Sequence, residues 1–292
     1  MGQVLAIDIG GTKLAAGLVD PAGVLVSRVH APTPAAANAE AIFAGLLQLI
    51  GQLPAPDATA CGVGCGGPMA PGGEAVSPLN IPAWRGFPLR SRLAAATGLP
   101  TYVDNDAKAL ALGEGWVGAA AGEPNFIAMV VSTGVGGGIV LDGRLLDGRS
   151  GNAGHIGHVI VEPGGRSCAC GARGCLEAEV SGLAIQAQTG RPAREAPPEL
   201  IERCGRLVGR AVGSVANLLD LPLAVVAGSV ALGFGAPFFA AAQAEIALTS
   251  ALEFSRGTVI RPGGLGDAGP LIGAAAVGLR GVAALRGQAP PG

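Results

Sequence analysis

The amino-terminal part of the chain contains three short apolar runs, at residues 4–9, 14–19 and 24–29, each bounded by Gly, Asp, Thr or Pro. Apolar runs of this length between turn residues are typical of β-strands. Because the connecting segments are short, the pattern predicts three antiparallel strands joined by tight turns.

Farther along, apolar positions at helical spacing alternate with further short apolar runs, which is typical of α/β proteins. Strands are expected at residues 58–63, 101–103, 126–131, 139–141, 223–227 and 259–261. Helices are expected at residues 35–53, 89–97, 107–117, 181–189 and 197–219, then in an Ala-rich stretch after residue 229 and again near the last residues.

The opening pattern recurs in the middle of the chain. Residues 6–26 read AIDIGGTKLAAGLVDPAGVLV, and residues 129–146 read MVVSTGVGGGIVLDGRLL. Both segments are an apolar run, a Gly-rich turn and a second apolar run. Such self-similarity predicts two domains of related architecture, with residues 118–124 as the linker.

The Gly-rich turn at residues 10–12 exposes backbone N–H groups and a hydroxyl, which suit a phosphate. Asp8, just before it, is placed to hold a hydrated Mg²⁺. The spacing is not that of a Walker loop, and a strand follows the turn in place of a helix. A plain hairpin turn is the alternative. Two such hairpins facing each other would define a cleft for a nucleotide.

Polar residues also follow two other predicted strands. Asp104, Asn105 and Asp106 lie between a strand and a helix, and Gly228 and Ser229 follow a later strand. Asn, Asp and Ser cap helices well, so capping is one interpretation of both places. A cap needs only one residue, however, so we expect one of the three residues 104–106 to act in catalysis.

A loop at residues 151–177 contains two of the three histidines and three of the six cysteines. One His and three Cys can close a tetrahedron around zinc, and the intervening glycines allow the tight turns that this requires. Free buried cysteines are the alternative. A disulfide is disfavoured, because nothing else indicates an oxidising compartment.

Composition restricts the function further. The chain has 292 residues, 49% of them hydrophobic and 14% charged, so it can bury a core that fits two domains. A net charge of −2 and the scarcity of aromatic residues argue against a nucleic-acid surface. The sequence shows neither a signal peptide nor an uninterrupted membrane-spanning run, so we expect a soluble cytoplasmic protein without membrane partners.

These motifs in this order resemble the ROK family of sugar kinases and repressors, and the resemblance covers nearly the whole chain. It implies an α/β, two-domain actin/hexokinase-like (ribonuclease H-like) fold with a cleft between the lobes. The smaller lobe would be residues 1–117, rejoined by a final helix at 272–290, and the larger lobe residues 118–271. The matching motifs are IDIGGTK, the Asn105–Asp106 pair, STGVGGG, GNAGHIGH, CACGARGCLE, AGSV and GDAGPLIGAA.

The resemblance implies an ATP-dependent kinase that transfers the γ-phosphate to the 6-hydroxyl of a hexose or N-acylhexosamine, glucokinase-like or N-acetylmannosamine kinase-like. It also implies a homodimer. Asp106 would be the general base, which phosphoryl transfer needs beside positioning and charge neutralisation. Asn80, Asn105, Asp106, His155, His158 and Glu177 would bind the sugar. Asp8, Gly10, Gly11, Thr12, Lys13, Thr133, Gly134 and Gly228 would line the ATP–Mg²⁺ site. A structural Zn²⁺ would be held by His158, Cys168, Cys170 and Cys175.

Two departures from the family pattern concern the sugar. The glucose-phosphorylating branch generally has Glu where this chain has His155, and the motif here is similar to that of bacterial N-acetylmannosamine kinases. A carboxylate accepts hydrogen bonds from two hydroxyls, whereas a neutral imidazole accepts once and donates once. The segment at residues 64–69, GCGGPM, also differs from the usual family loop. The preferred sugar therefore stays open.

Two other functions were weighed. A ROK repressor would carry a DNA-binding helix-turn-helix before the first hairpin, for which the sequence leaves no room; a gel shift with operator DNA would support that function. A non-catalytic sugar-binding or zinc-stabilised protein is disfavoured by the intact acids, the glycine turns and Lys13. Failure to bind ATP–Mg²⁺ with zinc present would support it.

Overall fold

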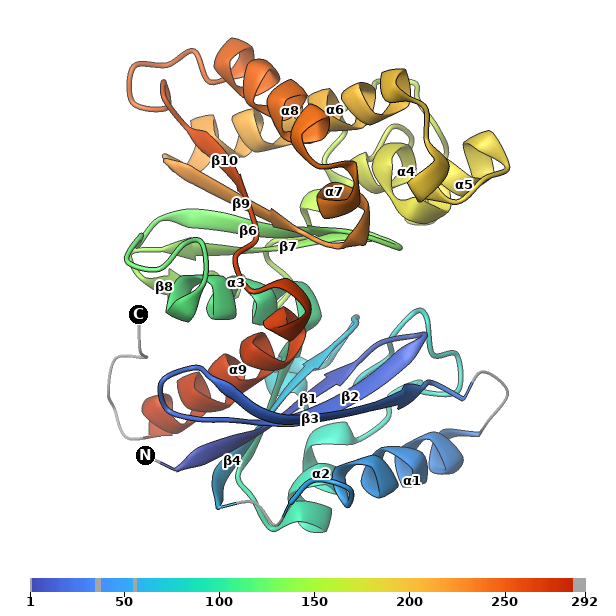
Figure 1. Ribbon diagram of the computed structural model, residues 1–292, viewed down its shortest axis with the longest axis vertical. Coiled ribbons are helices and arrows are strands. Elements are labelled where there is room, and N and C mark those ends of the chain that lie inside the picture. The colour runs from blue at the N-terminus through green and yellow to red at the C-terminus, as the bar shows by residue number, and fades with distance from the viewer. Residues whose placement is uncertain (1, 35–37, 55–56, 286–292) are drawn as a thin grey trace. The chain divides into compact units, whose positions relative to one another are not determined.

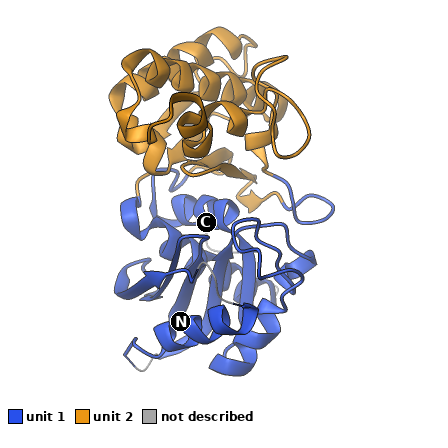
Figure 2. Ribbon diagram, turned by 90° about the vertical axis from the view of Figure 1, so that its right-hand side faces the viewer, with its two compact units in different colours: residues 1–122, 147–153, 265–292 blue, residues 123–146, 154–264 orange. Residues whose placement is uncertain are grey.

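The computed structural model describes residues 2–34, 38–54 and 57–285, and these fall into two compact units. Unit 1 comprises residues 1–122, 147–153 and 265–292, and unit 2 comprises residues 123–146 and 154–264 (Figure 2). Each unit contains one five-stranded sheet covered by helices (Figure 1).

Unit 1 is built on the sheet order β3-β2-β1-β4-β5. Strands β1, β2 and β3 are antiparallel neighbours, as the sequence predicted, and β4 and β5 continue the sheet parallel to β1. Its strands are β1 (Gln3–Ile9), β2 (Lys13–Val19), β3 (Leu25–Pro32), β4 (Ala58–Cys65) and β5 (Thr101–Asn105). Its helices are α1 (Ala39–Ile50), η1 (Pro71–Gly73), α2 (Leu89–Thr97), α3 (Asp106–Val117), η4 (Gly266–Ala268) and α9 (Gly269–Leu285).

Both faces of β1 and β2 are buried, which explains their continuous apolar runs, whereas the edge strand β3 exposes every second residue. Leu5 and Ile7 of β1 face the core formed with α1 and α2. Val4 and Ala6 face α9. The α9 backbone comes so close to β4 that a Cβ atom on Gly62 would collide with the carbonyl oxygen of Ala274. Only glycine can therefore occupy that position without moving the helix.

Unit 2 repeats the arrangement with the sheet order β10-β9-β6-β7-β8. Strands β6 and β7 form an antiparallel hairpin, and β9 is parallel to β6, as β4 is to β1. Its strands are β6 (Phe126–Val131), β7 (Val135–Leu141), β8 (Arg144–Leu145), β9 (Leu223–Ala227) and β10 (Val259–Pro262). Its helices are η2 (Ile156–His158), α4 (Leu176–Val180), α5 (Gly182–Thr189), η3 (Ala193–Glu195), α6 (Pro198–Leu219), α7 (Ser229–Phe234) and α8 (Ala236–Thr249).

The core of unit 2 lies between this sheet and the helix pair α6 and α8 (Figure 1). Ile127 and Met129 of β6 pack there with Val208 of α6 and Phe238 of α8. The long α6 buries one face rich in apolar residues and exposes a charged face, as an amphipathic surface helix does.

Two helix predictions need correction. The helix expected at residues 35–53 is shorter, because the Asn38 side chain accepts a 2.8 Å hydrogen bond from the Ala41 N–H and starts α1 at Ala39. Residues 35–37 lie outside the described residues. The Ala-rich stretch after residue 229 is two helices, α7 and α8, because Gly235 between them has a φ of 61°.

The division into units also differs from the predicted lobes. Unit 1, expected to be the smaller, is the larger, and it includes residues 265–271 and Asp147–Ala153, which were assigned to the other lobe. The second segment belongs to unit 1 because Lys108 and Arg280 both bind Asp147. Residues 286–290 of the predicted final helix lie outside the described residues.

The apolar stretch Gly266–Leu285 is long enough to cross a membrane by length and composition alone. However, 61% of its most apolar 18-residue window is buried inside the protein. Leu271, Ala274 and Leu279 pack on strands β1 and β2. Its apolar composition is therefore explained by its place in the core of unit 1.

Candidate active site

The carboxyl ends of three parallel strands in unit 1 bring two predicted site acids together. Asp8 of β1 pairs in register with Gly64 of β4, and Gly64 pairs with Asp104 of β5. A Cβ atom on Gly64 would lie 3.8 Å from Asp8 Oδ1 and 3.7 Å from the Asp106 Cα. The sheet therefore places Asp8 and Asp106 on either side of one glycine.

Asp8 is partly buried, and this changes its acidity. Burial and the negative charge of Asp106 together raise the pKa of Asp8 to about 7, and the positive charge of Lys13 limits the rise. A cation next to Asp8 would favour its ionised form, and a carboxylate oxygen is a ligand that Mg²⁺ prefers. Asp8 is therefore suited to a magnesium site.

The three polar residues Asp104, Asn105 and Asp106 make different contacts. Asn105 caps α3, since its Oδ1 accepts hydrogen bonds from the N–H groups of Ala107 and Lys108 at 3.0 and 3.4 Å. The capping interpretation is therefore right for Asn105. Asp104 binds Lys108 and Arg280 in ion pairs. Asp106, the first residue of α3, is exposed, and its carboxylate also contacts the Ala107 N–H at 2.9 Å.

The first Gly-rich turn lies at the same end of unit 1. The Gly10 N–H binds the Lys13 carbonyl at 2.9 Å, which closes the hairpin between β1 and β2. Asn80 packs directly on Gly11, so that a Cβ atom on Gly11 would collide with it. Thr12 and Lys13 are exposed. Five predicted site residues, Gly10 to Lys13 and Asn80, are thus brought together.

The second Gly-rich turn lies between β6 and β7 of unit 2, as the first lies between β1 and β2 of unit 1. Glu177 Oε2 accepts a 2.9 Å hydrogen bond from the Val135 N–H and comes close to Gly134. Thr133 beside it is exposed. This turn therefore joins a residue predicted to bind sugar with residues predicted to bind nucleotide.

Gly228 borders the same turn. It has a φ of 99°, and a Cβ atom there would collide with the Val131 carbonyl oxygen. The alternative in which Ser229 caps the next helix is wrong, because Ser229 is the first residue of α7 and makes no capping bond. Its hydroxyl lies 2.9 Å from the Ser132 hydroxyl instead.

The predicted metal ligands form one cluster in unit 2. One donor atom from each of His158, Cys168, Cys170 and Cys175 lies within 4.8 Å of the other three. Cys168 Sγ is 3.7 Å from His158 Nδ1, and Cys170 Sγ is 3.6 Å from Cys175 Sγ. Sulfur ligands of a tetrahedral zinc are about 3.8 Å apart, because each zinc–sulfur bond is about 2.3 Å. The donor set and its spacing therefore fit Zn²⁺.

The chain around this cluster turns at glycines and is anchored by a buried acid. Gly171 and Gly174 have φ values of 94° and 77°, which L side chains rarely adopt. Glu179, 1% exposed, accepts a 2.7 Å hydrogen bond from the Arg166 N–H and binds Arg203 at 2.8 Å. The chain segment just before the cysteines is thus held by Glu179 of α4, which is itself bound to Arg203 of α6.

The two histidines lie close together on the loop. Their ring centroids are 6.1 Å apart, and both residues are exposed. Because Nδ1 of His158 faces Cys168, its other ring nitrogen points away from the cluster. Cys170 is the exposed cysteine of the cluster, and hydrogen bonding from the Ala172 backbone and the neighbouring thiols lowers the pKa of its thiol.

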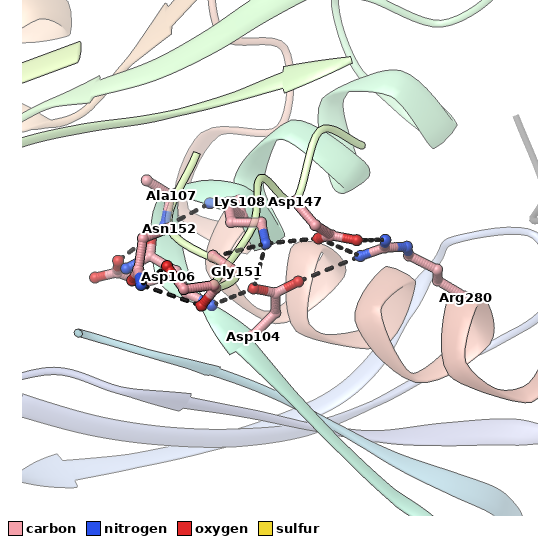
Figure 3. Close-up of polar contacts among 10 residues, drawn as sticks. Asp104, Asp106, Ala107, Lys108, Asp147, Gly151, Asn152 and Arg280 are labelled. Carbon is pink, nitrogen blue, oxygen red and sulfur yellow. Dashed lines mark hydrogen bonds and ion pairs between the residues drawn. The ribbon is translucent and has the colours of Figure 1, made fainter. Parts of the chain in front are cut away.

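Sequence reasoning missed one group of charged residues next to the predicted base. Lys108 and Arg280 bind Asp104 and Asp147 in a four-membered ion-pair group (Figure 3). One signal was available: lysine occurs only at positions 13 and 108 in the chain. Asp147 and Arg280 come from distant segments, so no local pattern could have joined them.

Comparison with known proteins shows to which family the chain belongs. The family model described as "ROK family" matches residues 4–280. The chain belongs to the ROK family. A curated relative named N-acetylmannosamine kinase, from Escherichia coli (strain ATCC 8739), is 40% identical over 250 residues, covering 79% of this chain and 84% of the relative.

Solved ROK structures resemble the whole chain. The ROK hexokinase from Thermus thermophilus has a TM-score of 0.83 at 34% identity, with coverage of 96% of this chain and 99% of that one. A ROK family glucokinase from Streptomyces griseus, solved with glucose and AMPPNP, has a TM-score of 0.82 at 29% identity, with coverage of 95% and 99%. The predicted family and the α/β actin-like sugar kinase fold are therefore confirmed.

Proposed function

We propose that this protein is an ATP-dependent sugar kinase that transfers the γ-phosphate to the 6-hydroxyl of a hexose or N-acylhexosamine. The observation that carries the proposal is the exposed Asp106 at the end of β5, in a chain that belongs to the ROK family over residues 4–280. Further support comes from relatives named N-acetylmannosamine kinase and from the similar ROK hexokinase and glucokinase.

Asp106 is the proposed general base. Phosphoryl transfer needs a positioned acceptor for the proton of the attacking hydroxyl, together with neutralisation of phosphate charge. Asp106 accepts the proton of the 6-hydroxyl as the oxygen attacks the γ-phosphorus and ADP leaves. Asn80, Asn105, His155, His158 and Glu177 are the proposed ligands of the sugar hydroxyls.

The nucleotide side of the proposal uses the two Gly-rich turns. Backbone N–H groups of Gly11 to Lys13 and of Thr133 and Gly134 bind phosphate oxygens, as successive N–H groups in turns do, while Gly10 closes the hairpin. Asp8 holds Mg²⁺, which neutralises phosphate charge when ATP is bound. The glycine at position 228 lets the nucleotide approach the backbone closely. Domain closure over an interlobe cleft stays a prediction, as does the homodimer.

N-acetylmannosamine is the sugar that we propose. The relative named N-acetylmannosamine kinase is 40% identical, and the Gly154–His155–Ile156–Gly157–His158 motif carries His in the place where glucose-specific members generally carry Glu. A neutral imidazole accepts one hydrogen bond and donates one, whereas a carboxylate accepts hydrogen bonds from two sugar hydroxyls. His155 therefore suits a sugar that offers one donor and one acceptor at this place.

Zinc is the proposed structural metal, held by His158, Cys168, Cys170 and Cys175. It would fix the loop that carries His158 and would leave the second ring nitrogen of that residue for the sugar. A metal-bound imidazole is a rigidly oriented hydrogen-bonding group. In this proposal the metal shapes the sugar site and takes no part in phosphoryl transfer.

The test is sugar-dependent ADP release, measured in a coupled assay over glucose, mannose, fructose, N-acetylglucosamine and N-acetylmannosamine. Asp106→Asn should lower kcat by about 10²–10⁴-fold, the usual contribution of a general base. The variant should still bind sugar and ATP–Mg²⁺ in calorimetry. Asp267→Asn, which changes an exposed aspartate outside the predicted site, is the matched control and should keep its activity.

Full turnover by Asp106→Asn would contradict the mechanism. A wild-type protein that bound sugar without ADP release would support the non-catalytic alternative. Specific operator binding in a gel shift would support the repressor.

A further inference from the structure

Lys108 is a buried lysine in the first turn of α3, two residues after Asp106. Its side chain is 3% exposed. The ammonium lies 3.0 Å from Asp104 Oδ1, 2.8 Å from Asp147 Oδ1 and 3.2 Å from the Gly151 carbonyl oxygen (Figure 3). An ammonium has three N–H donors, so these three acceptors use all of them. Lys108 therefore has no donor left for a phosphate or a sugar hydroxyl.

Arg280 of α9 binds the same two carboxylates. It lies 3.4 Å from Asp104 Oδ2 and 2.5 Å from Asp147 Oδ2. The two cations and two carboxylates balance in charge, and hydrogen bonds from Arg280 and Lys108 hold the pKa of Asp147 below its ordinary value despite its partial burial. Within the described ranges, Arg280 has no hydrogen bond to Gly151. Only Lys108 links this ion-pair group to that backbone carbonyl.

The contact with Gly151 joins the turn that carries Asn105 and Asp106 to a segment that precedes the loop with His155 and His158. The Asn105 side chain accepts from the backbone N–H of Lys108, so the first turn of α3, with Asp106 in it, is one fixed piece. The segment Asp147–Ala153 belongs to unit 1 and leads directly into the loop that starts at Gly154 and carries His155 and His158. Lys108 thus ties the turn of the proposed base to a point four residues before His155.

We propose that Lys108 is a positioning residue for sugar phosphorylation. Through Gly151 it holds the unit 1 segment that leads into the His155–His158 loop, and through Asp104 it fixes the strand end that precedes Asp106. This inference rests on the proposed function. It predicts a defect in sugar use and not in ATP use, because the hydrogen bonds and ion pairs of Lys108 in the described chain are made with Asp104, Asn105, Asp147 and Gly151, outside both glycine turns.

The experiment compares Lys108→Met with Arg280→Met. Both variants remove one positive charge from the same two carboxylates, and both should lower the melting temperature. Lys108→Met should raise the KM for sugar and lower kcat, together changing kcat/KM by about tenfold or more, while the KM for ATP stays within about twofold. Arg280→Met should leave the KM for sugar within about threefold of the wild type.

The variant Asp147→Asn is the second test if Lys108→Met does not fold. It keeps the shape of the aspartate side chain and weakens the ion pair between residue 147 and Lys108. It should raise the KM for sugar by a few fold, about the effect of one weakened charged hydrogen bond, with the KM for ATP unchanged. Calorimetric sugar affinity is measured for every variant.

Equal changes in Lys108→Met and Arg280→Met would overturn the proposal, because charge alone would then explain the effect. An unchanged KM for sugar in both Lys108→Met and Asp147→Asn would also overturn it. A wild-type protein that binds sugar without releasing ADP would contradict the kinase function instead, and the Lys108 proposal would then be decided by sugar affinity.

Discussion

The carboxylate of Glu177 accepts a 2.9 Å hydrogen bond from the backbone N–H of Val135, the first residue of β7. Glu177 lies at the start of α4, and Val135 directly follows the Thr133–Gly134 turn. A side chain proposed to hold a sugar hydroxyl therefore also fixes the turn proposed to hold phosphate. If both proposed roles hold, the sugar site and the phosphate turn of unit 2 depend on the same residue.

Replacing Glu177 should consequently weaken both substrates. Glu177→Ala removes a charged hydrogen bond to the turn and one to the sugar, and should raise the KM for sugar and the KM for ATP by about tenfold each. Steady-state kinetics with each substrate varied in turn measures this. Glu199→Ala, which removes an exposed glutamate from the first turn of α6, is the control. An effect on sugar alone would show that the turn does not depend on Glu177.

Removing a thiolate from the Cys3His cluster should lower both stability and sugar affinity. Metal binding adds to folding free energy, so Cys170→Ala, or chelation of the wild type, should lower the melting temperature by roughly 5 °C or more. Cys204→Ala changes a buried cysteine outside the cluster and should keep one equivalent of zinc, measured by elemental analysis. A chelated wild type with its melting temperature and sugar affinity intact would contradict the structural-zinc proposal.

Asp8→Asn should stabilise the protein while abolishing turnover. Folding raises the pKa of Asp8 from 3.8 to about 7. Between these values the native state keeps a proton that the unfolded chain has released, so the free energy of unfolding falls as the pH rises from about 4 to 7. At pH 8 without Mg²⁺, the variant should gain up to about 4 kcal/mol over the wild type.

Urea unfolding at pH 8 and at pH 4 in the presence of EDTA measures this difference. The gain should shrink toward zero at pH 4, because Asp8 is then neutral in the native state. A gain that was the same at both pH values would contradict the assigned cause. Loss of sugar-dependent ADP release at every pH is expected from the missing magnesium ligand.

Restoring the carboxylate of the glucose-specific branch should shift sugar preference. His155→Glu replaces one acceptor and one donor by a group that accepts from two hydroxyls. The ratio of kcat/KM for glucose to that for N-acetylmannosamine should rise by about tenfold, the value of one well-placed hydrogen bond. The variant should retain zinc, because His155 is outside the Cys3His cluster. An unchanged ratio would show that another residue determines the sugar.

Local patterns were enough to predict most of the fold. The runs at residues 4–9 and 14–19 are strands because both of their faces are buried, and the Gly10–Gly11 turn between them closes an antiparallel hairpin. The limits of the units were not predictable in the same way. Asp147 belongs to unit 1 through ion pairs with Lys108 and Arg280, and these three residues are far apart in the sequence.

The candidate site also has parts that local sequence patterns predict and parts that depend on residues far apart in the chain. The Cys3His cluster lies within one short loop, so residue types and spacing were sufficient to predict it. The meeting of Asp8 and Asp106 at Gly64 depends on the order of three strands in a sheet, which no local pattern contains. The bond from Glu177 to Val135 likewise depends on how α4 packs beside β7.

Helix α9 has a consequence for how the chain reaches its final form. Leu271, Ala274 and Leu279 cover Val4 and Ala6 of β1, so a helix that is synthesised after all of unit 2 covers one face of a sheet that begins at Gln3. One face of unit 1 must therefore remain uncovered while all of unit 2 is being synthesised. The helices of unit 2 all lie in its uninterrupted segment Gly154–Gly264, so unit 2 can form its helical layer first. Nascent chains that stop short of α9 should accordingly depend on chaperones until translation ends.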